Sequence, residues 1–184
     1  MEARLNNGTK LWEFDTNVTP ELTGFPGLVG NEQNLPFISW DFNGDGRWEV
    51  YFQYYSAGQR RHRIVDGMTG NALVDVAFPE NNWTAPKSMA IVAHRGGIPR
   101  IVTAFNTKYS NLSQNFYMFT AWTGSAWSLD QMWKYTRDIG AAHNYMQAAD
   151  VDENGSDDEI LAGRVVLNAN GTVRYDLGVH DSGA

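Results

Sequence analysis

The feature that most constrains the fold is an internal repeat of strand-forming segments. Three segments share an apolar strand, a short polar loop and a second apolar strand, at residues 37–52, 89–102 and 146–161. Each is followed by another pair of apolar segments that turns on a glycine, at Gly70, Gly124 and Gly171. The pattern recurs at roughly 50 residues, and periods of about 40 to 50 are typical of β-propellers. Two hairpins in each period predict a four-stranded blade.

The repeat predicts an all-β, β-propeller-type fold with three four-stranded blades and part of a fourth. The start of the chain, residues 5–14, resembles residues 167–175 and is predicted to be the outer hairpin of that partial blade. The predicted blade units, within one domain spanning 1–184, are approximately 1–16, 34–80, 86–136 and 140–178. Amphipathic helical periodicity is missing. A β-sandwich, which has similar short strands, is the alternative that the matched hairpins disfavour.

Two of the loops inside the repeat have the composition of a calcium site. Residues 41–49 and 150–158 place oxygen-bearing side chains at positions 1, 3, 5 and 9 and glycine at position 6. Calcium takes six to eight oxygen ligands, and the carbonyl of position 7 supplies another. An EF-hand has its last glutamate at position 12 and flanking helices, so we expect short β-loop sites; a solvated Asx-rich turn is the alternative. The predicted ligands are Asp41, Asn43, Asp45, Arg47, Glu49, Asp150, Asp152, Asn154, Ser156 and Asp158.

The middle copy of this loop, residues 93–100, has none of the acidic ligands. We therefore expect the blade predicted at residues 86–136 to close this turn without metal. A ligand set that is absent from one blade indicates that calcium stabilises the loops and is not required in each blade for catalysis.

Composition excludes several classes of partner. The chain has 21 acidic and 14 basic residues, a net charge of -7, and no basic run longer than Arg60-Arg61. Duplex nucleic acid requires a basic face, so we predict no nucleic-acid partner. No apolar stretch reaches the roughly 18 to 20 residues of a membrane span, so we predict no membrane partner. Cysteine is absent, which excludes disulfides and thiolate zinc sites.

Residues 140–163 resemble the rhamnogalacturonan lyases of polysaccharide lyase family 11. The eight-bladed propellers of that family carry a similar His-Asn pair followed by Ala-Asp-Val-Asp-x-x-Gly-x-Asp-Glu-Ile. His143-Asn144 and residues 149–160 resemble this stretch, with one additional Asp before Glu159. The resemblance continues through residues 177–181 and 64–73 and covers the chain from about Ser39 onward. The chain corresponds to less than half of an eight-bladed ring and has no counterpart of the family's N-terminal β-domain.

The resemblance implies a secreted, extracellular enzyme that cleaves an acidic polysaccharide, the rhamnogalacturonan backbone, by calcium-assisted β-elimination. Elimination beside a uronate requires a neutralised carboxylate and a base for the C5 proton. His143 and His180 are candidates to bind metal or sugar or to act as the base; polar turn residues are the alternative. Where the family has Arg-Gly-Tyr-Tyr, residues 104–109 read Ala-Phe-Asn-Thr-Lys-Tyr, so Lys108 or Arg137 is the candidate replacement cation.

Two other functions are compatible with the same residues. One is a non-catalytic, calcium-stabilised propeller module for glycan binding or adhesion, in which exposed aromatic rings stack on sugars, although Trp12, Trp40, Trp122, Trp127 and Trp133 are expected mainly in the core. The other is architectural: three blades cannot close a ring, and open edges seek strands. The partner would then be a second copy in a homo-oligomer or the remainder of a larger propeller.

Overall fold

The described structure, a computed structural model, comprises residues 1–15, 37–57, 59–80, 88–106, 113–138 and 146–176. Every regular element within these ranges is a β-strand, and the strands form three four-stranded antiparallel sheets and one two-stranded sheet. The predicted all-β fold of three four-stranded blades and part of a fourth is confirmed. No helix long and apolar enough to span a bilayer occurs in these ranges.

We name the sheets in chain order. The N-terminal hairpin pairs β1 (Glu2–Arg4) with β2 (Lys10–Glu13). Blade 1 contains β3 (Phe37–Trp40), β4 (Glu49–Ser56), β5 (Gln59–Asp66) and β6 (Ala72–Ala77). Blade 2 contains β7 (Ser88–Arg95), β8 (Ile98–Asn106), β9 (Ser113–Thr120) and β10 (Gln131–Asp138). Blade 3 contains β11 (Met146–Ala149), β12 (Glu159–Ala162), β13 (Val165–Leu167) and β14 (Val173–Asp176).

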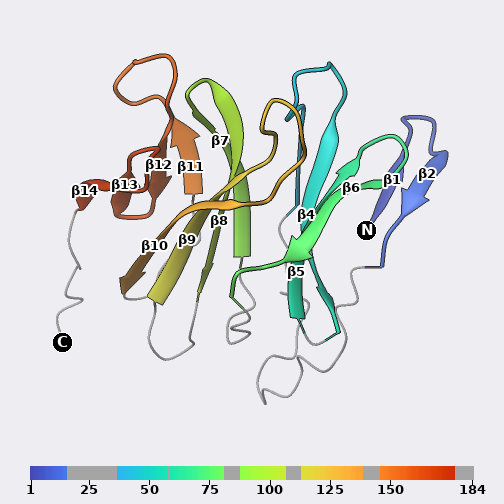
Figure 1. Cartoon of the computed structure of the whole chain (residues 1–184), viewed down its shortest axis with the longest axis horizontal. Coiled ribbons are helices and arrows are strands. Elements are labelled where there is room, and N and C mark those ends of the chain that lie inside the picture. Colours follow the sequence, from blue (N-terminus) through green and yellow to red (C-terminus); the bar gives the residue numbers. More distant parts are fainter. Residues whose placement is uncertain (16–36, 58, 81–87, 107–112, 139–145, 177–184) are drawn as a thin grey trace.

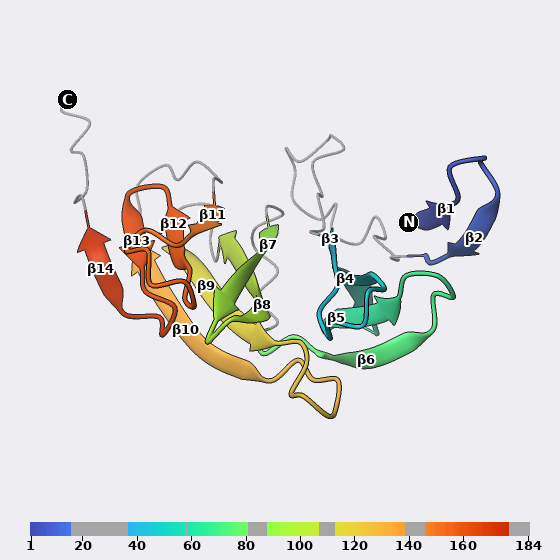
Figure 2. The same cartoon turned by 90° about the horizontal axis from the view of Figure 1, so that it is seen from above.

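The sheets stand side by side along an arc, with the N-terminal hairpin at one end and blade 3 at the other (Figures 1 and 2). Within each blade the strands are hydrogen-bonded in sequence order. The first strands β3, β7 and β11 line the concave side, where β7 contacts both of the others, and the fourth strands lie on the convex side (Figure 2). This is the strand arrangement of neighbouring blades around a propeller axis.

Blade 2 is buried on both faces because it lies between two other blades. Successive side chains of a strand point to opposite faces. In β9, Tyr117 and Phe119 pack into the core shared with blade 1, whereas Phe116 and Met118 pack into the core shared with blade 3. A strand covered on both sides requires a continuous apolar run, which explains why residues 116–119 are all large and apolar.

The outer strand of every sheet has a shift in register near its start, and one residue follows directly after each shift. These residues are Trp12, Val74, Trp133 and Tyr175. The indole Nε1 of Trp12 donates a hydrogen bond to the Gly67 carbonyl of blade 1 (2.9 Å), and that of Trp133 donates to the Ala169 carbonyl of blade 3 (2.9 Å). Outer-strand tryptophans therefore attach one sheet to the outer turn of the following sheet.

Polar groups are also buried between blades 1 and 2. His62 is fully buried and makes edge contacts with the rings of Phe78 and Phe119. Burial lowers the pKa of His62 to about 3, with nearby Arg60 acting in the same direction, so the imidazole is neutral. Among the described residues neither ring nitrogen of His62 has a hydrogen-bond partner.

Candidate metal centres

Loop 1, residues 41–48, joins β3 to β4 and is curled around the carboxylate of Asp41. That carboxylate accepts hydrogen bonds from the backbone N–H groups of Gly44 (2.8 Å), Asp45 (3.1 Å) and Gly46 (2.9 Å). Gly46 has a φ of 84°, which favours glycine. The Asn43 amide donates to the Asp45 carboxylate (3.0 Å). Position 1 therefore accepts from the loop backbone, and the side chains of positions 3 and 5 contact each other.

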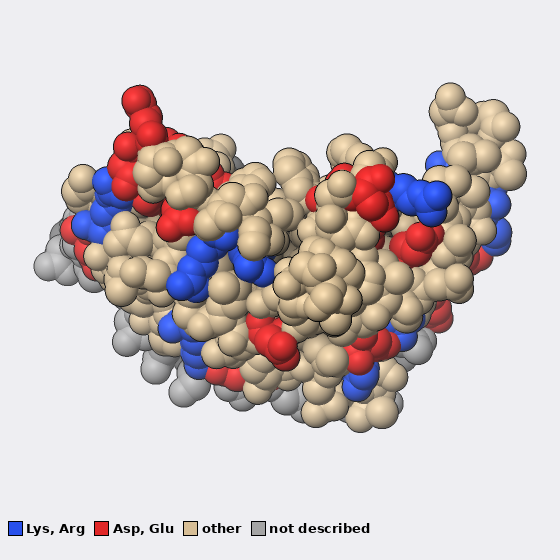
Figure 3. Space-filling model, turned by 45° about the horizontal axis from the view of Figure 1, so that its top comes forward, with Lys and Arg blue, Asp and Glu red and all other residues tan. Residues whose placement is uncertain are grey.

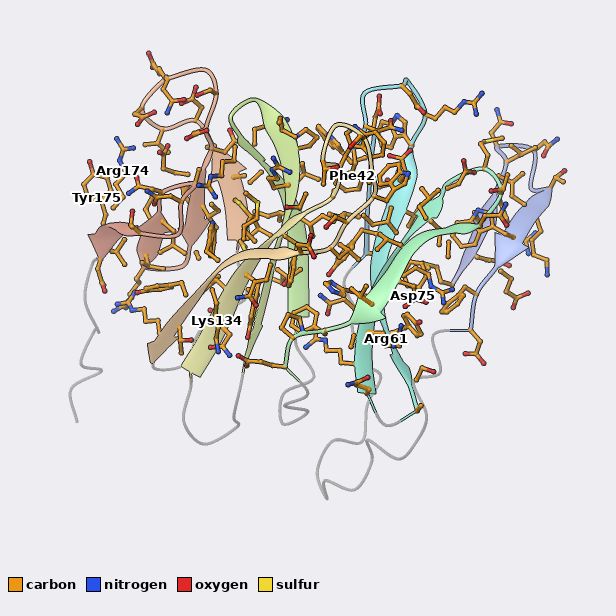
Figure 4. All side chains as sticks on the ribbon, in the orientation of Figure 1. Phe42, Arg61, Asp75, Lys134, Arg174 and Tyr175 are labelled. Carbon is orange, nitrogen blue, oxygen red and sulfur yellow. The ribbon has the colours of Figure 1, made fainter. Side chains whose placement is uncertain are left out.

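Glu49, the first residue of β4, closes loop 1 from below. Its side chain is buried, and Oε2 accepts a hydrogen bond from the Phe42 backbone N–H (3.0 Å). The buried Phe42 ring anchors the loop in the core between blades 1 and 2 (Figure 4). Burial raises the pKa of Glu49 to about 6, opposed by the Phe42 hydrogen bond and reinforced by the carboxylates of Asp45, Asp41 and Asp66. A buried carboxylate among other carboxylates is a position where a bound cation is strongly favoured.

The raised pKa of Glu49 predicts a specific pH dependence for the metal-free protein. Protonated Glu49 is favoured in the folded state, so its contribution to stability is full below about pH 4.5 and is lost as the pH rises through about 6. In chelator, Glu49→Gln is expected to gain up to about 2 kcal/mol relative to wild type between about pH 4.5 and 7.5. Urea unfolding of both proteins across this range measures the difference. If the difference in unfolding free energy between Glu49→Gln and wild type does not change with pH, the raised pKa of Glu49 is contradicted.

Loop 3, residues 150–158, joins β11 to β12 and repeats the curl of loop 1. The Asp150 carboxylate accepts hydrogen bonds from the backbone N–H groups of Asn154 (2.9 Å) and Gly155 (2.7 Å). One carboxylate oxygen each of Asp150, Asp152 and Glu159 lie within 4.8 Å of one another. Three carboxylates at this spacing, with the Asn154 amide beside Asp152, form an all-oxygen donor set that suits a hard divalent cation.

The structure places Glu159, and not the predicted Asp158, at the position in blade 3 that is equivalent to Glu49 in blade 1. Glu159 pairs with Ala149 as Glu49 pairs with Trp40, and its Oε2 accepts a hydrogen bond from the Val151 N–H (2.9 Å) as Glu49 does from Phe42. Loop 3 is therefore one residue longer than loop 1. A signal was available in the sequence, because both glutamates directly precede the apolar residues of the following strand.

Asp158 faces blade 2 instead of the loop interior. It accepts a hydrogen bond from the His94 backbone N–H (2.7 Å), and the His94 Nδ1 atom lies 2.9 Å from the same oxygen. The β7–β8 turn also donates from Gly96 to the Asp157 carboxylate (2.6 Å) and from Gly97 to the Ser156 carbonyl (2.7 Å). The turn that lost the acidic residues thus supports the neighbouring loop of blade 3.

Arg174 distinguishes loop 3 from loop 1. Its Nη1 atom donates to Asp152 (2.7 Å) and to Glu159 (2.8 Å), and this contact lowers the pKa of Asp152. The corresponding bulge position in blade 1 is Leu73, which packs against the core between blades 1 and 2. An internal cation therefore balances part of the charge in loop 3, whereas the groups that shift the pKa of Glu49 in loop 1 include no cation.

The acidic loops occupy the same edge of the molecule. In the view of Figure 3 the acidic side chains gather in two groups along this edge, one over blade 1 and one over blade 3, with basic side chains between them. The intervening basic groups lie over blade 2. The edge that holds loops 1 and 3 therefore carries acidic groups over blades 1 and 3 and basic groups between them.

Three of the four predicted catalytic residues, Lys108, His143 and His180, lie outside the described residues. The fourth, Arg137 near the end of β10, is almost fully buried and pairs through Nη2 with Asp176 of blade 3. This ion pair joins blade 2 to blade 3. Within the described ranges the Nη1 atom of Arg137 has no hydrogen-bond partner.

Comparisons with known proteins agree with this architecture. No protein-family model and no curated protein matches the sequence. Among solved structures, the exotype rhamnogalacturonan lyase YesX aligns over 95% of this chain and 34% of its own, with a TM-score of 0.72 and 19% identity. Rhamnogalacturonan lyase YesW aligns over 95% of this chain and 35% of its own, with a TM-score of 0.71 and 18% identity. The Bacillus licheniformis rhamnogalacturonan lyase PL11 aligns over 95% of this chain and 35% of its own, with a TM-score of 0.72 and 19% identity.

The chain spans about one third of the length of these enzymes. The resemblance to part of a rhamnogalacturonan lyase, expected from residues 140–163, is confirmed at the level of the fold. At this sequence identity the likeness concerns the fold and leaves the reaction to be argued from residues.

Proposed function

We propose that the chain is a calcium-stabilised part of a secreted lyase that cleaves rhamnogalacturonan-type pectic polysaccharide by β-elimination. The single observation that carries this proposal is the structural match to three rhamnogalacturonan lyases over 95% of the chain. The sequence resemblance in residues 140–163 supports it independently, because it includes the His143-Asn144 pair that precedes loop 3 in the sequence.

The donor sets of loops 1 and 3 fit calcium. In loop 1 the ion would be held by Asp41, Asn43, Asp45, Glu49 and the Arg47 carbonyl. In loop 3 it would be held by Asp150, Asp152, Asn154 and Glu159, because the Ser156 carbonyl accepts from Gly97 of blade 2. Bound calcium would neutralise the loop carboxylates and fix the first two strands of each blade. A divalent cation can also neutralise the uronate carboxylate of an acidic polysaccharide, which a chain with a net charge of -7 would otherwise repel.

The catalytic roles remain assigned to His143 and His180, with Lys108 as the candidate cation. β-Elimination needs a group that removes the C5 proton of the uronate, and a neutral histidine near its ordinary pKa suits that task. Arg137 is less suited, because its guanidinium is buried and already paired with Asp176. Its role in our proposal is to hold blade 3 against blade 2.

The proposal predicts a lyase signal that depends on calcium and on histidine. Protein incubated with rhamnogalacturonan and calcium should raise the ultraviolet absorbance of unsaturated uronate, and His143→Gln or His180→Gln should slow this rise by about 100-fold or more. Unchanged calcium-dependent melting of each variant is the control for folding. No absorbance change under conditions where a full-length rhamnogalacturonan lyase is active would reject catalysis by this chain.

A pair of exposed tryptophans favours the second candidate, a non-catalytic glycan-binding module. Trp40 was expected in the core but is 38% exposed, and Trp48 beside it is 60% exposed. Their ring centroids are 6.5 Å apart, and Trp40 also contacts His94 of blade 2. Aromatic faces bind sugar rings by burying apolar area. Glycan binding that is weakened by Trp48→Ala, without release of unsaturated product, would favour this function.

A further inference from the structure

Three outer turns of the molecule are closed by equivalent pairs of backbone hydrogen bonds, and the turn of blade 1 is one residue longer than the other two. In the N-terminal hairpin, Leu5 N–H donates to Thr9 O and Gly8 N–H donates to Leu5 O, both at 2.9 Å. In blade 1 the equivalent donations run from Asp66 to Asn71 (3.0 Å) and from Gly70 to Asp66 (2.8 Å). In blade 3 they run from Asn168 to Thr172 (2.9 Å) and from Gly171 to Asn168 (2.8 Å). Gly8, Gly70 and Gly171 therefore occupy one structural position.

Two of these three turns are covered by an aromatic ring from the preceding sheet. A Cβ added at Gly70 would lie 2.6 Å from the Trp12 ring, and one added at Gly171 would lie 2.7 Å from the Trp133 ring. Each indole also donates to the carbonyl of the first turn residue, Gly67 or Ala169. Among the described residues nothing covers the third turn, because a Cβ added at Gly8 would meet no atom within 4 Å.

The matching aromatic residue is exposed at the other end of the arc. Tyr175 follows the register shift of β14, as Trp12 and Trp133 follow the shifts of β2 and β10. It is 56% exposed and lies at the outer end of blade 3 (Figure 4). The same face of blade 3 exposes Val151 by 48%, whereas Phe42, its equivalent in loop 1, is 1% exposed beneath blade 2. In blade 1 the equivalent residues, Phe42 and Val74, pack in the core shared with blade 2, whereas no described sheet covers Val151 and Tyr175 of blade 3.

We infer that Tyr175 of one copy docks on the outer turn at residues 6–8 of a second copy, so that the chain associates head to tail. The aromatic residue and the open turn belong to the same chain and lie at opposite ends of the arc (Figure 2). The contact repeats between two copies the arrangement seen twice within the chain, where Trp12 and Trp133 each cover the outer turn of the following sheet. Because the two contacting surfaces differ, it is heterologous and generates a ring if the rotation closes and a filament if it does not. The inference does not depend on the proposed reaction.

Two variants separate the two sides of this interface. Gly8→Asn places a Cβ where the docked ring would lie, while Asn tolerates the positive φ of 85° and has open space in the isolated chain. Tyr175→Ser removes the docking ring from an exposed position. Circular dichroism and thermal melting should therefore match wild type for both variants, and each should weaken self-association by about 30-fold or more.

Light scattering coupled to gel filtration, over a range of protein concentrations, measures the association. The mass of wild type should rise with concentration, and each variant alone should remain monomeric where wild type associates. An equimolar mixture should form dimers and nothing larger, because Tyr175 of the Gly8→Asn chain still fits the intact turn of the Tyr175→Ser chain. A monomeric wild type, variants that associate like wild type, or a mixture that stays monomeric would overturn the inference.

Discussion

Replacing Gly70 or Gly171 by alanine is expected to lower the free energy of unfolding by about 3 kcal/mol, whereas Gly8→Ala should lower it by only about 1 kcal/mol. All three glycines have a positive φ, at 71°, 83° and 85°, so the backbone strain of alanine is common to the set. The three positions differ in whether a side chain of the neighbouring sheet covers the glycine.

The additional cost at Gly70 and Gly171 comes from the tryptophan that covers each turn. The new Cβ would lie 2.6 Å from the Trp12 ring or 2.7 Å from the Trp133 ring, well inside ordinary contact distance. The indole must move away, which removes its hydrogen bond to Gly67 or Ala169 and part of its packing in the interblade core. The loss therefore measures how strongly one sheet is attached to the next.

Thermal unfolding compares the three variants directly. For a chain of this size about 1 kcal/mol corresponds to about 2 to 4 °C, so the expected falls in Tm are about 6 to 12 °C at Gly70 and Gly171 and about 2 to 4 °C at Gly8. Gly124→Ala is a second control, because Gly124 also has a positive φ and open space around its Cβ position. Equal losses at Gly8, Gly70 and Gly171 would show that strain alone decides the result.

Much of the architecture could be predicted from the sequence because strand signals are local. Alternating apolar residues and glycine turns at a regular period were sufficient to expect three four-stranded sheets and a partial fourth. The doubly buried run at residues 116–119 also indicates a blade covered on both faces. These features depend only on residues close together in the chain.

The parts that could not be predicted depend on contacts between blades. Counting positions from Asp150 predicts Asp158 as a ligand, but one additional residue in loop 3 places the Glu159 carboxylate near Asp150 and Asp152 and turns Asp158 toward His94. Likewise, nothing local distinguishes Trp12 and Trp133, which attach neighbouring sheets, from Trp40, which is exposed. Each of these roles depends on a contact with a neighbouring blade, whose residues are distant in the sequence.

Arg174 and His62 illustrate the same limit for charge. Arg174 lies on the last strand but donates to Asp152 and Glu159 of loop 3. The sequence pattern of the loop contains no sign of this internal cation. His62 falls in an ordinary alternating strand, yet complete burial between two blades lowers its pKa to about 3 and removes it from any role that requires a protonated imidazole near neutral pH.

Removing calcium is expected to have the largest effect on stability. An ion present at about 100 times its dissociation constant stabilises the folded state by about 2.7 kcal/mol for each site, so two occupied loops contribute about 5 kcal/mol. Loop 1 should depend on the ion more than loop 3. Glu49 is buried among carboxylates, whereas Arg174 already balances part of the charge around Glu159.

Matched substitutions distinguish a ligand from a neighbour in loop 3. Glu159→Gln should reduce the stabilisation by calcium, because it removes one charged oxygen donor from the set with Asp150 and Asp152. Asp158→Asn should weaken the contact with His94 and lower the Tm by a similar amount with and without calcium. If Asp158→Asn reduces the stabilisation by calcium and Glu159→Gln does not, Asp158 is the ligand instead of Glu159.

Thermal unfolding of the wild-type chain and of Glu49→Gln, each in calcium and in chelator at neutral pH, tests the calcium loops most directly. We expect calcium to raise the Tm of wild type by about 10 to 20 °C and that of Glu49→Gln by roughly half as much. A wild-type Tm that is the same in calcium and in chelator would contradict the account of both loops.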